Sequence, residues 1–97
     1  MSKLKIISDE PDMSGIVKSA INAEIKRLEV GLEKTNREIR KFEEKYSLSS
    51  SEFLKGTTAD ELQGGDEDYI RWSGELKIRE RILEDLEKLK DIEYVAN

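Results

Sequence analysis

The fold is decided by the sequence SGIVKSAINAEIKRLEVGLEKTNREIRKFEEKYS, which spans residues 14–47. Apolar residues recur in it at alternating steps of four and three, the spacing of the a and d positions of a coiled coil. These positions are Ile21, Ile25, Leu28, Leu32, Thr35, Ile39, Phe42 and Tyr46. Thr35 alone interrupts the apolar seam, so the pattern predicts one long helix over residues 14–47.

A second helix is predicted over residues 66–95, where apolar side chains form two neighbouring stripes at helical spacing. The first stripe holds Trp72, Leu76, Leu83 and Leu86, and the second holds Ile78, Ile82, Leu89 and Ile92. A connector over residues 48–65 separates the helices, and in it Ser49, Ser50 or Ser51 followed by Glu52 predicts one short capped helix. We expect Asp12 or Ser14 to cap the first long helix and Asp66 to cap the second.

Together these elements predict an all-α fold, in which residues 1–97 form a single antiparallel two-helix coiled-coil hairpin with a short connector helix. The hairpin can bury the seam of the first helix and one stripe of the second. The remaining stripe would stay in water, and a chain of this length has a small core. We therefore expect two hairpins to pair into a dimeric four-helix bundle, although the pattern does not decide which stripe faces outwards.

Residues 1–13 are expected to form an N-terminal arm or a short strand. Residues 3–8 alternate well enough for a strand, with Leu4 and Ile6 on one face and Ile7 on the other. No other segment of the chain has a strand pattern, so such a strand would pair with its symmetry mate or with the sheet of another protein. A frayed tail is the equally consistent alternative.

Composition excludes most catalytic chemistry. The 97 residues include no Cys and no His, which removes disulfides, thiolate or imidazole metal sites, and Cys or His catalysis. Because 40% of the residues are charged, carboxylates are expected on solvent faces, and we expect no enzyme, no catalytic residue and no cofactor. The apolar part of the amino terminus is too short for a signal peptide and no apolar run reaches the length of a membrane span, so a cytoplasmic protein without membrane contact is expected.

The net charge of −5 is concentrated in the connector, where residues 49–68 carry six acidic residues and one basic residue. The two helices are nearly balanced, so direct binding of nucleic acid is not expected. Glutamates lie at helical spacing between the basic residues in the middle of the first helix, which favours intrahelical ion pairs over a phosphate-binding stripe. The acidic run Asp66, Glu67 and Asp68 lacks the pattern of an EF-hand loop, so helix capping is favoured over a metal site.

Six residues are candidates for binding a protein partner: Phe53, Leu54, Tyr69, Trp72, Glu75 and Arg79. Trp, Tyr and Arg are over-represented among the residues that dominate binding energy at interfaces. Glu75 and Arg79 lie one turn apart in the apolar arc of the second helix, where they form either an intrahelical salt bridge or the polar part of an interface with Tyr69 and Trp72. Phe53 and Leu54 are expected to fold over the end of the hairpin.

From Phe42 onward the sequence resembles a family of small helical antitoxin-like proteins, which are encoded beside small toxins. That family carries a phrase of the form EEKYG-SS-EF, followed by GDDEDY and EWAGEL. Residues 43–46, 50–53, 65–69 and 72–76 match this pattern. The sequence departs from it at Ser47, where the family has Gly, and at Arg71, where the family has an acid. The resemblance covers a little over half of the chain and includes no catalytic motif.

The resemblance implies an antitoxin that neutralises a cognate toxin by covering the active surface of that toxin with helices. The acidic connector would then dock against a small basic toxin, whose identity the sequence does not give. A self-assembling structural adaptor, in which hairpins pair without a toxin, is the alternative. A DNA-binding autoregulator of the ribbon-helix-helix type is disfavoured, because the basic strand and the second short helix that it needs are missing.

Overall fold

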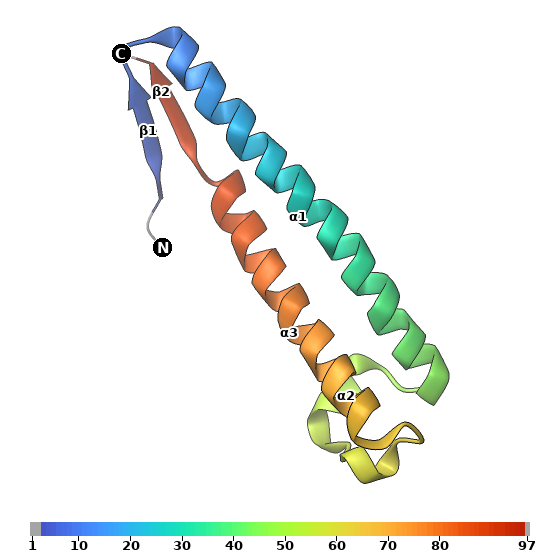
Figure 1. Ribbon diagram of the computed structural model, residues 1–97. Helices are drawn as coiled ribbons and strands as arrows, with labels where there is room; N and C mark the ends of the chain where they lie inside the picture. The colour runs from blue at the N-terminus through green and yellow to red at the C-terminus, as the bar shows by residue number, and fades with distance from the viewer. Residues whose placement is uncertain (1–2, 97) are drawn as a thin grey trace.

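The structure, a computed structural model that describes residues 3–96, is an elongated helical hairpin measuring 59 × 24 × 17 Å (Figure 1). Two long helices, α1 (Pro11–Tyr46) and α3 (Gly65–Lys90), run antiparallel and pack against each other. The connector between them holds a short helix, α2 (Ser50–Gly56), and a 3-10 turn, η1 (Ala59–Glu61). The predicted helical hairpin with its short connector helix is thereby confirmed.

Other predictions about the whole molecule have different outcomes. No helix within residues 3–96 combines the length and the apolar character that a membrane crossing needs. The pairing of two hairpins into a four-helix bundle stays a prediction. Residues 1 and 2 of the predicted arm, and residue 97 at the other end, lie outside the described residues.

The first long helix begins three residues earlier than predicted. Its first residue is Pro11, whose fixed φ angle suits the first position of a helix, and no side chain caps this end. The expected caps Asp12 and Ser14 were therefore wrong. After Tyr46 the chain leaves the helix through Ser47, which adopts the left-handed conformation with φ 48° and ψ 46°.

The connector confirms one predicted cap and corrects another. The Ser49 hydroxyl accepts a hydrogen bond from the Glu52 amide, with 3.1 Å between oxygen and nitrogen, and so caps α2 as predicted. The cap expected of Asp66 was wrong, because α3 begins at Gly65 and the residue at its N-cap position is Gly64. Gly65 takes a positive φ of 57°, a conformation that glycine adopts without steric cost.

The hydrophobic core lies at the connector end of the hairpin. Its buried cluster comprises Ile39, Phe42, Phe53, Leu62, Trp72 and Leu76. Along α1 every residue of the predicted seam is buried or half-buried, as the heptad spacing requires. On α3 the exposed apolar residues Ile78 and Leu83 come from different predicted stripes. The water-facing side of α3 is therefore not one stripe, as predicted, but a mixture of both.

The two ends of the chain form a small parallel sheet that the sequence did not predict. Helix α3 ends at Lys90 rather than at residue 95, and β2 (Glu93–Ala96) pairs with β1 (Lys5–Ser8). The expectation that the chain has no second strand was wrong, because an aromatic and a β-branched residue, Tyr94 and Val95, favour a strand there and the pairing satisfies backbone groups of both segments. The sheet adjoins α1, since the Lys18 ammonium lies 5.6 Å from the centre of the Tyr94 ring.

Candidate functional site

Trp72, one of the six predicted contacts with a partner, is at the centre of the hydrophobic core. Its exposed fraction is 0%, and its ring stacks on the Phe53 ring with 4.0 Å between centroids and 8° between planes. The rings of Phe42 and Tyr46 stack on it from α1, with centroids 5.7 and 5.9 Å away. This corrects the sequence-based assignment of Trp72 to an outer interface. Phe53 folds over the end of the hairpin as predicted, but the helical stripe alone does not show that this connector residue covers Trp72.

The two predicted connector contacts have opposite environments. Phe53 is buried, and its ring meets that of Tyr69 at 5.3 Å with a tilt of 56°, while Tyr69 itself is half-buried. Leu54 is 66% exposed and does not fold over the end of the hairpin as predicted. Of these predicted residues, Leu54 is therefore the one that is fully open to a partner.

Arg79 connects the two long helices. Its guanidinium nitrogen Nη1 donates a hydrogen bond to the Asn36 side-chain oxygen of α1 over 3.4 Å. Glu75 and Arg79 are both half-buried. In place of a salt bridge within α3, the first of the two predicted alternatives, Arg79 makes a contact across the hairpin, which brings it into the α1–α3 interface.

A polar cluster, which the sequence analysis missed, fastens the acidic start of α3 to the end of α1. The carboxylate of Asp68 accepts hydrogen bonds from the Lys45 ammonium, 2.6 Å away, and from the Tyr46 hydroxyl. The Tyr46 oxygen in turn accepts a hydrogen bond from the Gly64 amide over 2.9 Å. The bonds from Lys45 and Tyr46 lower the pKa of Asp68, and the bond with Asp68 raises the pKa of Lys45. Asp68 precedes Trp72 by one helical turn, a spacing that places both residues on the buried face.

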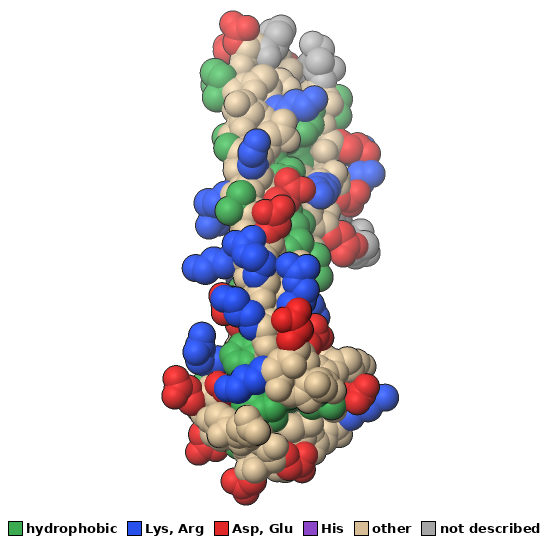
Figure 2. All heavy atoms as spheres, turned by 90° about the vertical axis from the view of Figure 1, so that its right-hand side faces the viewer, with side chains coloured by type: hydrophobic (Ala, Val, Ile, Leu, Met, Phe, Trp, Pro, Cys, Tyr) green, Lys and Arg blue, Asp and Glu red, His purple; other side chains and the backbone are tan. Residues whose placement is uncertain are grey.

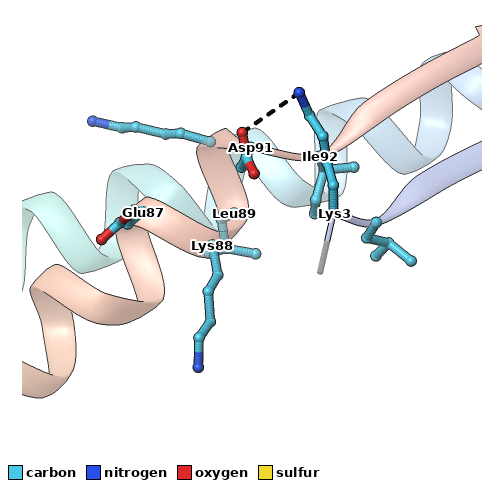
Figure 3. A pocket seen from close by; sticks show the side chains of 8 residues that line it. Lys3, Glu87, Lys88, Leu89, Asp91 and Ile92 are labelled. Atoms are coloured by element: carbon cyan, nitrogen blue, oxygen red, sulfur yellow. Dashed lines mark ion pairs between the residues drawn. The ribbon is translucent and has the colours of Figure 1, made fainter. Parts of the chain in front are cut away.

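An open groove lies beside the C-terminal end of α3, between Lys3 and Leu4 and the last turn of that helix (Figure 3). Its volume is about 710 Å³, and its apolar lining consists of Leu4, Leu89 and Ile92. Charged residues complete the lining: Lys3, Glu87, Lys88, Lys90 and Asp91. A surface that combines apolar and charged side chains is common at protein interfaces.

Ion pairs fix one wall of this groove. The Lys3 ammonium lies 3.0 Å from a carboxylate oxygen of Glu93 and 3.8 Å from one of Asp91 (Figure 3 draws the second pair). The hydrogen bond with Glu93 raises the pKa of Lys3 and lowers the pKa of Glu93. Leu4, the next residue, is 58% exposed. The wall therefore presents an apolar side chain to solvent beside two exposed ion pairs.

The surface charge of the hairpin changes along its length. Figure 2 shows Lys and Arg side chains gathered midway along the hairpin and acidic side chains gathered at the connector end. Two of the predicted intrahelical ion pairs are present, Arg27 with Glu24 at 2.6 Å and Lys41 with Glu38 at 3.2 Å. The connector acids Asp60, Glu61, Asp66 and Glu67 are exposed. The acidic connector therefore remains available to a basic partner.

Comparison with known proteins gives no match to a protein-family model, a curated protein or a solved structure. Within residues 3–96, no three acidic side chains come together in a way that could hold a metal ion. The groove and the exposed acidic connector are the features on which a functional proposal can be built.

Proposed function

We propose that this protein is a non-enzymatic protein-interaction module that binds and neutralises a small cognate toxin, as the antitoxin-like proteins that its sequence resembles do. The observation that carries the proposal is the groove, whose lining includes the apolar side chains of Leu4, Leu89 and Ile92. An exposed apolar surface with a polar rim marks a site where another protein binds.

The chemistry of the two ends of the hairpin supports a basic toxin as the partner. Residues 49–68, which include the first turn of α3, carry six acidic residues and one basic residue. Asp68 already pairs with Lys45, but the other five acids of this segment face solvent. Complementary charge steers association and excludes wrong partners, so these acids would attract a basic protein whose apolar segment then occupies the groove.

Co-expression with the adjacent open reading frame tests the proposal. We expect the product of that gene to arrest growth when expressed alone, and to be harmless and to co-purify when this chain is present. Leu4→Asp should abolish both rescue and co-purification, because it places a charge among the apolar side chains that line the groove. Since position 4 is exposed, the free protein should fold with aspartate there. Ile70→Asp is the matched control, since Ile70 is 66% exposed on α3 and does not line the groove.

Two outcomes would contradict the antitoxin proposal. One is an adjacent gene product that is harmless by itself, and the other is a toxic product that remains toxic when this chain is abundant. Equal rescue by the wild type and by Leu4→Asp would show that the groove is not the binding site. Circular dichroism of each variant separates lost binding from lost folding.

The alternative is a self-assembling structural adaptor whose hairpins pair into a dimeric four-helix bundle. The exposed apolar side chains Val30, Ile78 and Leu83 on the long helices support it, because a second hairpin would cover them. Changing both Ile78 and Leu83 to Lys should then convert a dimer into a monomer. A dimer unaffected by this change would contradict the bundle.

A further inference from the structure

Strand β1 has an open edge. The sheet contains two strands in the order β1–β2, so within residues 3–96 one edge of β1 pairs with β2 and the other pairs with no strand. Figure 1 shows β1 on the outside of the sheet and β2 between β1 and α1. Two paired strands are marginal in water, and parallel sheets normally have their surfaces covered. A free edge of this kind is a template for a further strand.

The hydrogen-bond pattern identifies which residues face the open edge. The Glu93 amide donates to the Leu4 carbonyl over 2.9 Å, and Lys5 lies opposite Glu93 in the register. Backbone groups of successive residues in a strand point to opposite edges. Those of Leu4, Ile6 and Ser8 are therefore directed at β2, and those of Lys5 and Ile7 are directed at the open edge. The Ile7 side chain is 59% exposed, so this edge is also apolar at its centre.

We propose that a second copy of this chain covers the edge, with β1 of each copy pairing antiparallel about a two-fold axis at Ile7. The resulting sheet has four strands in the order β2, β1, β1, β2. The axis places Ile7 opposite Ile7 of the second copy, where each residue exchanges backbone hydrogen bonds with the other. Each exposed isoleucine side chain then covers the other.

Charge complementarity supports this register and this occupant. A two-fold axis at Ile7 sets Lys5 of each copy, whose ammonium also lies 3.9 Å from Glu93 of its own chain, opposite Asp9 of the other copy, the residue that follows β1. Opposite charges on directly facing residues stabilise a pair of antiparallel strands. A parallel arrangement in the same register would instead set Lys5 beside Lys5. The strand is therefore self-complementary only in the antiparallel direction.

The shape of this dimer differs from that of a four-helix bundle. Because β1 lies beyond the end of α3 and runs roughly along the hairpin (Figure 1), antiparallel pairing directs the two hairpins away from each other. The maximum dimension should then clearly exceed the 59 Å of one hairpin. In a four-helix bundle the two hairpins lie side by side and the length stays close to that of one.

A proline at position 7 tests the edge directly. Proline has no N–H, and at Ile7 the missing group is the one directed at the open edge, so the ladder with β2 keeps its hydrogen bonds. We expect the dimer dissociation constant of Ile7→Pro to rise at least tenfold in sedimentation equilibrium, with the helical circular dichroism signal unchanged. Ile7→Val keeps the N–H and a β-branched side chain and should dimerise like the wild type.

A single cysteine tests the register. The chain has no other Cys, and a hydrogen-bonded antiparallel pair has Cα atoms about 5.5 Å apart, which lies within the range that a disulfide spans. Ile7→Cys should form a covalent dimer under mild oxidation, at a protein concentration where the wild type is dimeric. Ile70→Cys, exposed to a similar degree but located on α3, should cross-link at least tenfold more slowly.

Three results would overturn the strand-edge dimer. They are a wild-type chain that is monomeric at all accessible concentrations, an Ile7→Pro variant that dimerises like the wild type, and a dimer no longer than one hairpin by small-angle X-ray scattering. The inference does not rest on the antitoxin proposal, which concerns the groove. Since Leu4→Asp reports on the groove and Ile7→Pro on the edge, either proposal can fail while the other stands.

Discussion

The indole nitrogen of Trp72 donates a hydrogen bond to the hydroxyl oxygen of Ser50, 3.0 Å away, in a fully buried environment. The backbone amide of Ser50 also donates to a carboxylate oxygen of Glu43 over 2.9 Å. One residue of α2 therefore contacts both long helices through hydrogen bonds. The connector thus holds the two helices together at the end where the core lies.

Replacing Ser50 with alanine should lower the free energy of unfolding by about 1–3 kcal/mol, because the buried N–H of Trp72 would lose its acceptor. Urea unfolding followed by the fluorescence of Trp72, the single tryptophan of the chain, measures this change. Ser51→Ala is the matched control, since the Ser51 side chain is exposed in the same helix. Equal stability of the two variants would mean that the hydrogen bond contributes nothing.

The pairing of Asp68 with Lys45 and Tyr46 should make the protein sensitive to acid. Since these hydrogen bonds lower the pKa of Asp68, the folded state binds its proton less readily than the unfolded state does. The stabilisation is complete above the usual pKa of an aspartate, about 4, and is lost as the pH falls through the lower pKa of the folded state.

Measuring the free energy of unfolding from about pH 6 to pH 2 checks this dependence. Asp68→Asn should be less stable than the wild type at pH 6 and should lose less of its stability on acidification. Asp66→Asn, at an exposed acid in the same first turn of α3, should keep the acid dependence of the wild type. An acid dependence that is the same in Asp68→Asn and the wild type would contradict the role assigned to this pair.

The sequence predicted the two long helices better than it predicted the connector and the terminal strands that pack against them. The heptad steps from Ile21 to Tyr46 reflect local geometry, and every one of these positions is buried or half-buried. The environment of Trp72 depends on the connector, whose irregular backbone leaves no periodic signal. The pairing of β1 with β2 joins four-residue strands at opposite ends of the chain, and strands that short carry too little pattern to predict a partner.

The candidate site was predicted less well than the fold. Leu54 is exposed as a partner contact must be, while Phe53 and Trp72 are part of the core. The groove could not be predicted, because Leu4 and Ile92 come together only after the terminal strands have paired. The sequence pattern places Leu4 in the N-terminal arm and Ile92 in the second long helix, and it does not predict a contact between them.

Glycine at position 47 should stabilise the hairpin. Ser47 is the one residue other than glycine with a positive φ within residues 3–96, and it lies where the antitoxin-like pattern carries Gly. Ser47→Gly should raise the free energy of unfolding by about 0.5–1 kcal/mol, since glycine adopts the left-handed conformation without steric cost. Ser49→Gly, which removes the cap of α2, should instead lower it by a few tenths. A loss of stability in Ser47→Gly would contradict the left-handed conformation at this position.

Replacing Gly64 of the connector and Gly74 of α3 with alanine should change the free energy of unfolding in opposite directions. A Cβ atom at Gly64 would overlap the carboxylate of Asp68, although the φ of −81° and the ψ of 0° suit alanine. Gly64→Ala must therefore displace the Asp68 carboxylate, and we expect it to lower the free energy of unfolding by about 1–3 kcal/mol. A Cβ at Gly74 meets nothing within 4 Å, so Gly74→Ala should raise it by about 0.5–1 kcal/mol through helix propensity.

A double-mutant cycle shows whether the contact between Gly64 and Asp68 causes this loss. In an Asp68→Ala background the carboxylate is absent, so adding Gly64→Ala should cost much less than it does in the wild type. Urea unfolding of the four proteins gives the coupling between the two positions. If Gly64→Ala costs the same in both backgrounds, the loss comes from the backbone of the connector and not from the displaced carboxylate.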